Sequence, residues 1–264
     1  MRGYLAILKI RMKTLLQYRA AALAGICTQL FWGMVMAMTL RAFYNEAPST
    51  HQPLSVEQAI TFIWIGQALL QLMPWNIDKE IEAQIRNGNV VYELVRPIHL
   101  YGLWFARAFA MRLIPTAMRC LPIFFFGGLL FGFSPPVSWE AAAVFCCSIF
   151  LALFLSSTIT TLVITTLFWT LSGEGILRLL PHITVLLSGM VVPLPLFPGW
   201  VQPFLNLQPF RGIVDIPCRL YTGVIPSAEA PMYLGFQVGW ILLLTIAGLA
   251  LMRRATHRFV IQGG

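Results

Sequence analysis

Residues 141–171 read AAAVFCCSIFLALFLSSTITTLVITTLFWTL, a run of 31 residues that contains no Asp, Glu, Lys or Arg. A helix rises about 1.5 Å per residue and the hydrocarbon core of a bilayer is about 30 Å thick, so about 20 apolar residues can cross it. The run is longer than this and uncharged throughout. It therefore predicts a transmembrane helix over Ala141–Leu171.

The composition of the whole chain points to the same class of protein. Of the 264 residues 58% are hydrophobic and 11% are charged, and the mean hydropathy is +0.75. A soluble domain has about 45–50% apolar and about 25% charged residues, so a soluble enzyme and a disordered chain are both excluded. We expect an all-α polytopic membrane protein, a single transmembrane domain over 1–264. Its six predicted transmembrane helices are Ala20–Leu40, Gln58–Trp75, Leu113–Phe133, Ala141–Leu171, Ile176–Val192 and Tyr233–Met252.

The segment before the first span, residues 1–19, has the pattern of an amphipathic helix. Its apolar residues recur at helical spacing and share one face, next to a stripe of basic residues, which suits a helix lying in the membrane interface. The alternative is a charged cytoplasmic extension of the first span. The apolar face is Leu5, Leu8, Met12 and Leu15, and the basic stripe is Arg2, Lys9 and Lys13.

The segment 193–232, between the last two predicted spans, is apolar but holds eight of the 17 prolines. Proline removes a backbone donor and clashes with the preceding turn, so a continuous helix is excluded here. Broken backbone at membrane depth is tolerated only where protein covers it or a cavity adjoins it. We therefore expect short re-entrant helices at the outer face.

The distribution of basic residues predicts the orientation. There are 18 Lys and Arg against 10 Asp and Glu. With six spans, 15 of the 18 basic residues fall on one side and the other three are Arg41, Arg211 and Arg219. By the positive-inside rule both termini are expected in the cytoplasm, and the basic excess is expected to face anionic lipid rather than nucleic acid.

No motif for chemistry is visible in the sequence. There is no Walker-type phosphate loop, no metal-binding spacing among the five cysteines and four histidines, and no acidic residue at the centre of a predicted span. We therefore expect no catalytic site, no metal site and no cofactor in this chain. A partner would have to supply the energy for any uphill transport.

The most charged segment, residues 77–112, contains the string DKEIEAQIRNGNVVYELVRPI at 78–98. It predicts two short helices, one ending at Asn87-Gly88 and one at Arg96-Pro97, because Gly and Pro end helices. Two short charged helices between spans suit the docking of a soluble partner. The alternative is a plain solvated loop.

The six spans, the lead-in that ends in Tyr18-Arg19-Ala20, and the elements Ile85–Gly88 and Leu94–Pro97 together resemble an ABC transporter permease of the type-2 exporter superfamily, in its drug/viologen-exporter-like branch. The resemblance implies a multi-pass protein of the bacterial cytoplasmic (inner) membrane. It implies two copies of a soluble ABC ATPase that hold ATP and Mg, and a second permease in a homodimer or a sister-permease heterodimer. The coupling residues that it implies by position are Glu80, Ile85, Arg86, Gly88, Glu93 and Arg96.

Polar residues within the predicted spans are candidates for a substrate path. These side chains could line a lumen for the substrate, form hydrogen bonds to the backbone of their own helix, or join neighbouring helices. Arg119 lies within the third predicted span. It could have a function there, or its guanidinium could extend to the water interface, and we favour the second interpretation. The expected cargo is an amphipathic, drug-like or lipid-like molecule. A passive channel or a membrane scaffold without an ATPase is the alternative, and a membrane-embedded enzyme is disfavoured. The path candidates are Gln67, Gln71, Ser157, Thr161 and Thr165.

Overall fold

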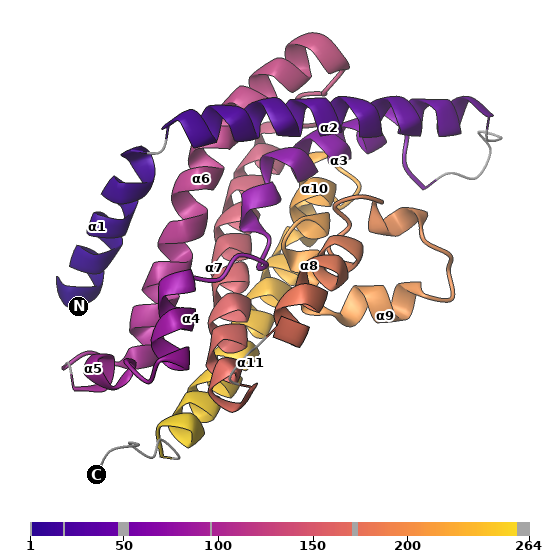
Figure 1. The fold of residues 1–264 in the computed structure, drawn as a ribbon. Helices are drawn as coiled ribbons and strands as arrows, with labels where there is room; N and C mark the ends of the chain where they lie inside the picture. The colour runs from indigo at the N-terminus through magenta and orange to yellow at the C-terminus, as the bar shows by residue number, and fades with distance from the viewer. Residues whose placement is uncertain (1, 18, 47–52, 96, 171–173, 258–264) are drawn as a thin grey trace.

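The structure, a computed structural model, describes residues 2–17, 19–46, 53–95, 97–170 and 174–257. All regular elements in these residues are helices (Figure 1). The α-helices are α1 (Arg2–Gln17), α2 (Arg19–Glu46), α3 (Val56–Ala68), α4 (Lys79–Arg86), α5 (Val91–Leu94), α6 (Leu100–Phe131), α7 (Trp139–Thr170), α8 (Glu174–Leu187), α9 (Gln202–Leu207), α10 (Asp215–Tyr221) and α11 (Ala230–His257). Short 3₁₀ helices are η2 (Leu70–Leu72), η3 (Leu194–Leu196), η4 (Pro209–Gly212) and η5 (Ser227–Glu229).

Within the described residues, four helices are long and apolar enough to cross a membrane: Ala20–Glu46, Leu100–Leu129, Trp139–Thr170 and Ser227–His257. They correspond to the first, third, fourth and sixth predicted spans. The third begins at Leu100 rather than at Leu113, because Arg107 and Arg112 lie inside helix α6 and not in a loop. The predicted segment 77–112 therefore ends in the first turns of α6.

The second predicted span, 58–75, is not one long helix. Helix α3 has 13 residues, and the chain continues as η2 and then turns at Pro74. At 1.5 Å per residue α3 is about 20 Å long, shorter than the hydrocarbon core. All residues from Ala59 to Ala68 are buried, so α3 packs inside the protein rather than facing lipid.

The fifth predicted span, 176–192, is also shorter than expected. Helix α8 has 14 residues and is followed by Gly189, whose φ of 79° is favourable only for glycine among common residues. The segment 193–232 forms η3, α9, η4, α10 and η5, with proline in the first turn of the first three. The depth of these short helices in a bilayer stays a prediction, as does the interfacial position of α1.

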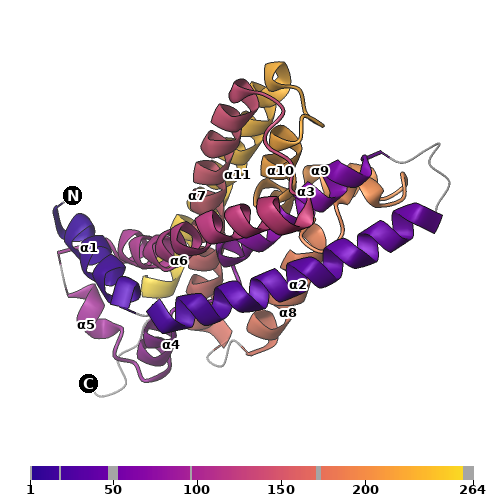
Figure 2. The ribbon, with the colours of Figure 1, turned by 90° about the horizontal axis from the view of Figure 1, so that it is seen from above.

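Helix α7 is the centre of the bundle and contacts α6, α10 and α11. In both views α1, α4, α5 and the end of α11 lie toward one end of the molecule, and α9 lies toward the other (Figures 1 and 2). The molecule thus has two distinct ends joined by α6, α7 and α11.

Arg112 is a fully buried cation that links three parts of the bundle. Its Nε donates to Ser156 Oγ at 2.7 Å, and its Nη2 donates to Thr160 Oγ1, so α6 is joined to α7. The same Nη2 also donates to the carbonyl of Asn76 at 3.4 Å, just after η2. Hydroxyls and carbonyls therefore take the place of an acidic partner, since a buried charge must be hydrogen-bonded.

Two glycines allow the fully buried Trp64 of α3 to pack between α2 and α6. A Cβ on Gly33 of α2 would lie 2.6 Å from Trp64 Cζ3, and a Cβ on Gly127 of α6 would lie 3.1 Å from Trp64 Cδ2. The small residues thus bring both long helices onto one indole ring.

We predict that Gly33→Val lowers the midpoint of thermal unfolding in detergent, because overpacking of this kind costs about 1–3 kcal/mol. The matched control is Gly235→Val in α11, where an added Cβ meets no atom within 4 Å. The control should unfold like the wild type when folded protein is measured by size-exclusion chromatography after heating. Equal midpoints for the two variants would contradict the packing of Trp64 against α2.

Candidate functional site

Helix α4 begins where an acidic side chain caps it. Asp78 Oδ1 accepts a hydrogen bond from the backbone N–H of Glu80 at 3.0 Å, which satisfies one of the free donors at the start of a helix. The helix ends at Asn87, and Gly88 follows with a φ of 73°. The chain then enters the short α5. The sequence between Asp78 and Gly88 thus forms one compact, capped helix.

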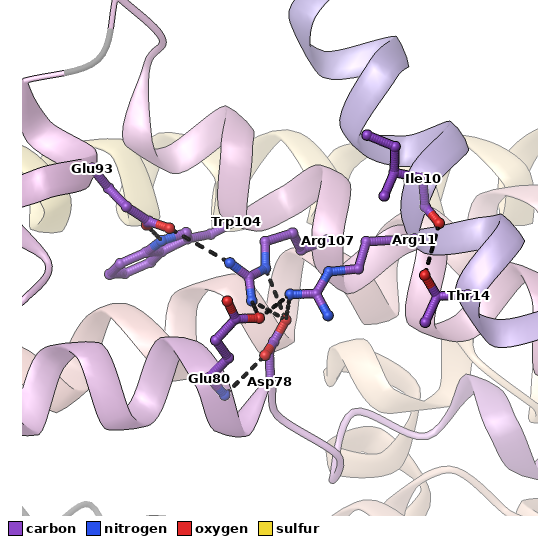
Figure 3. Close-up of polar contacts among 8 residues, drawn as sticks. All are labelled: Ile10, Arg11, Thr14, Asp78, Glu80, Glu93, Trp104 and Arg107. Atoms are coloured by element: carbon purple, nitrogen blue, oxygen red, sulfur yellow. Dashed lines mark hydrogen bonds and ion pairs between the residues drawn. The ribbon is translucent and has the colours of Figure 1, made fainter.

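Arg107 of α6 lies at the centre of a cluster of carboxylates (Figure 3). Its Nε donates to Asp78 Oδ2 at 2.8 Å, and its Nη2 donates to Glu80 Oε2 at 2.7 Å. Its Nη1 donates to Glu93 Oε1 at 3.5 Å. One guanidinium therefore holds side chains from the start of α4 and from α5.

Glu93 is held from a second side as well. Its Oε2 accepts from Trp104 Nε1 at 2.9 Å, and the carboxylate is buried (Figure 3). Trp104 and Arg107 are three residues apart in α6 and so share a face of that helix. Two neighbouring side chains of α6 therefore fix the position of α5.

The N-terminal helix joins the same cluster through Arg11. Its Nη2 pairs closely with Glu80 and lies 3.6 Å from Asp78 Oδ2 (Figure 3). Helix α1 also packs along α6. We use the term ion cluster for Arg11, Asp78, Glu80, Glu93 and Arg107.

The ion cluster has three carboxylates and two guanidiniums, so each carboxylate has a cationic neighbour. Burial raises the pKa of Glu80, but the hydrogen bond from Arg11 and the charges of Arg107 and Arg11 outweigh it and hold the pKa below its ordinary value. A lowered pKa means that the carboxylate stays ionised at neutral pH, where its ion pairs are present. The contact weakens only when the pH falls through the lowered pKa.

An apolar cluster lies next to these charges and attaches α4 to three long helices. Ile81 and Ile85 of α4 are buried against Trp104 of α6, Leu167 of α7 and Met252 of α11. The charged and the apolar contacts together seat α4 and α5 on the end of the bundle.

The opposite face of the α4–α5 segment is exposed. Tyr92 and Val95 are 71% and 77% exposed. Arg86 is also exposed and pairs with Glu82 at 2.7 Å. An exposed face with apolar and charged groups is available to a second protein.

The six coupling residues predicted from the resemblance fall in different places. Glu80 and Glu93 join the ion cluster, whereas Ile85 belongs to the buried apolar cluster. Arg86 and Gly88 lie on the exposed face. Arg96 lies outside the described residues. Their coupling role stays a prediction.

Sequence reasoning missed Arg11, Asp78, Trp104 and Arg107 as members of this site. A signal was present in part, because Trp104 and Arg107 share a helix face and Asp78 precedes a helix start. The treatment of residues 100–112 as a loop hid the first of these signals. The pairing of Arg11 with Glu80 has no signal in the local sequence.

The predicted path residues have partners within the bundle. The hydroxyls of Ser157, Thr161 and Thr165 each donate to the carbonyl four residues earlier in α7, at 2.7–2.8 Å. Gln67 is buried and its Nε2 lies 3.6 Å from Met36 Sδ, while Gln71 is half-buried in η2. Their place on a substrate path stays a prediction.

The described residues contain no group of three or more His, Cys, Asp or Glu side chains arranged to hold a metal ion. The same residues place Asp78, Glu80 and Glu93 around arginines, which occupy the positions that a cation would take. The arrangement is suited to holding α1, α4 and α5 on α6.

The sequence matches the family model described as ABC-2 family transporter protein over residues 30–263. No curated protein matches the chain closely enough to count as a relative. The family match covers most of the chain and includes α4, α5 and α6, although Arg11 precedes it. The chain therefore belongs to the ABC-2 family of transporter proteins, as a multi-pass membrane permease of an ABC transporter.

Proposed function

We propose that the chain is the membrane-spanning subunit of an ABC exporter that moves an amphipathic, drug-like or lipid-like substrate outward by alternating access. Permeases of this family normally work with an ABC ATPase. In the proposal two copies of that separate ATPase bind ATP and Mg and dock on the exposed face of α4 and α5. The drug/viologen-exporter-like branch is part of the proposal.

The observation that carries the proposal is the two-sided nature of the α4–α5 segment. One side is exposed at Tyr92 and Val95. The other side is attached to α6 by the hydrogen bonds of Arg107 and Trp104 to the carboxylates. A protein that pulls on the exposed side therefore moves α6, and Arg11 carries the movement to α1.

The proposed location is the bacterial cytoplasmic membrane with both termini in the cytoplasm. The positive-inside count supports this orientation. The arrangement of α1, α4, α5 and the end of α11 toward one end of the molecule is consistent with it (Figures 1 and 2). This end is then the one that a soluble ATPase can reach.

A second permease is the other proposed partner, either a copy of this chain or a sister permease. Helix α2 exposes large apolar side chains, among them Leu23, Phe31, Trp32 and Met38. Such a face suits lipid and also a second set of helices in the membrane. A passive channel or a scaffold without an ATPase is the alternative function, and the partner found by purification separates it from the exporter.

We predict that a Walker-motif ATPase co-purifies with the chain from detergent-solubilised membranes and that Val95→Asp abolishes this. A charge at the centre of an apolar contact opposes docking because the carboxylate must lose its water. Val137→Asp is the matched control, since Val137 is 70% exposed and lies in the α6–α7 connection. Mass spectrometry of the bound proteins is the measurement. Wild-type protein that brings down no ATPase would favour the channel or scaffold.

We predict that Arg11→Gln loosens α1 without unfolding the bundle. A partly exposed ion pair contributes about 0.2–1 kcal/mol, so amide exchange in residues 2–17 should rise about 1.4- to five-fold. The exposed Lys13 lies on the same helix outside the ion cluster, so Lys13→Gln should leave the exchange unchanged. Hydrogen exchange followed by mass spectrometry measures both. Equal exchange in the two variants would remove Arg11 from the coupling proposal.

We predict that acid has the same local effect on the wild type. As the pH falls through the lowered pKa of Glu80, the carboxylate is protonated and its pairs with Arg11 and Arg107 weaken. Exchange in residues 2–17, corrected for the intrinsic rate, should then rise only at pH values below the ordinary Glu pKa of about 4.3. Glu80→Gln should show the faster exchange already at neutral pH. A wild-type rise near pH 6 would contradict a lowered pKa.

A further inference from the structure

A cavity of about 870 Å³ lies at the end of the molecule opposite the ion cluster. It is formed by η3, α9, η4, α10 and the first turns of α11, whereas the other end of α11 packs on α4 through Met252. Among its lining residues are Phe197, Asn206, Arg211, Arg219, Tyr233 and Phe236. Its volume is that of a site for a small organic molecule.

The charge of this cavity is positive. Arg211 Nη2 and Arg219 Nη1 lie 3.4 Å and 3.6 Å from the same oxygen of Asp215, which is completely buried behind them. One carboxylate thus holds two guanidiniums side by side, and one positive charge is left over. None of the described residues that line the cavity is acidic.

The two guanidiniums have more donors than the protein uses. Each has five N–H groups. Arg211 Nη1 donates to the carbonyl and to Oδ1 of Asn206, at 3.0 Å and 2.7 Å. The Nε atoms of both arginines have no hydrogen-bond partner among the described residues. Arg211 is 5% exposed, the Arg219 side chain is 20% exposed, and both line the cavity, so a ligand there meets a guanidinium pair whose charge one carboxylate only half balances.

The remaining wall is aromatic and apolar. The guanidinium carbon of Arg211 lies 5.7 Å from the ring centre of Tyr233 and 5.6 Å from that of Phe236, both in the first turns of α11. Met232 and Phe197 extend the apolar surface. These rings hold the guanidinium in place and offer surface to a hydrocarbon group.

We propose that this cavity binds an anionic amphiphile. Its phosphate or carboxylate head pairs with Arg211 and Arg219, and its apolar part lies against Phe197, Met232 and Phe236. A cationic ligand is disfavoured by the leftover positive charge and the lack of an acidic lining residue. The inference does not rest on ATPase coupling, because binding here involves neither α4 nor α5.

The test is the equilibrium binding of radiolabelled dodecyl phosphate to the full chain, purified in a neutral detergent. Dodecyltrimethylammonium and dodecyl maltoside are the cationic and neutral probes. Dodecyl phosphate should bind at least ten-fold more tightly than either. Arg219→Gln should weaken its binding at least ten-fold, since the Arg219 side chain is 20% exposed and its replacement leaves the packing in place.

Asp215→Asn should act in the opposite direction and strengthen the binding of dodecyl phosphate, because it removes the carboxylate that competes for both guanidiniums. Arg253→Gln, a loss of one exposed charge at the other end of α11, should change nothing. Size-exclusion chromatography and circular dichroism confirm that each variant is folded.

The source of the natural ligand is distinguished by native mass spectrometry of the same preparations. An adduct with the mass of an anionic phospholipid that is lost in Arg219→Gln identifies a lipid head group. Tight dodecyl phosphate binding without such an adduct identifies a soluble anionic amphiphile. Equal binding of the three probes, or unchanged binding of dodecyl phosphate in Arg219→Gln, would overturn the proposal and leave the exporter proposal untouched.

Discussion

The pairing of Arg107 with three carboxylates is the interaction on which the arrangement of this end of the molecule depends. Arg107 is 5% exposed, and a charge so far from water is stable only when it is paired and hydrogen-bonded. Asp78 and Glu80 at the start of α4 and Glu93 in α5 meet that need. The requirement of one buried side chain therefore sets where α4 and α5 lie on α6.

The same helix meets a second buried cation in a different way. Arg112 lies little more than one turn after Arg107, and it is satisfied by the hydroxyls of Ser156 and Thr160 and by backbone carbonyls. The first arginine thus joins α6 to the exposed α4–α5 segment, and the second joins it to the central α7. In the proposed exporter, α6 carries a displacement at α4 to the middle of the bundle, because Arg107 and Arg112 lie on one continuous helix.

Much of the fold was predictable because hydropathy is a local property. The run at 141–171 corresponds to α7, and the apolar stretches that became α2 and α11 were also recognisable. The second and fifth spans were predicted as full crossings because their residues are apolar, but α3 is apolar for a different reason. Its residues from Ala59 to Ala68 are covered by protein, and a hydropathy pattern does not distinguish burial in protein from burial in lipid.

The sequence by itself determined the membrane class of the protein, its helical composition, the proline-broken segment before α11 and the charged helices after α3. The tertiary structure alone decided that Arg11 meets Glu80, that Arg107 lies in a helix rather than a loop, and that Arg211 and Arg219 share Asp215 beside a cavity. The physical reason is the distance along the chain over which each kind of interaction acts. Helix formation and hydropathy depend on neighbours along the chain, whereas an ion pair depends on a few ångströms between side chains that only the packing of distant elements brings together.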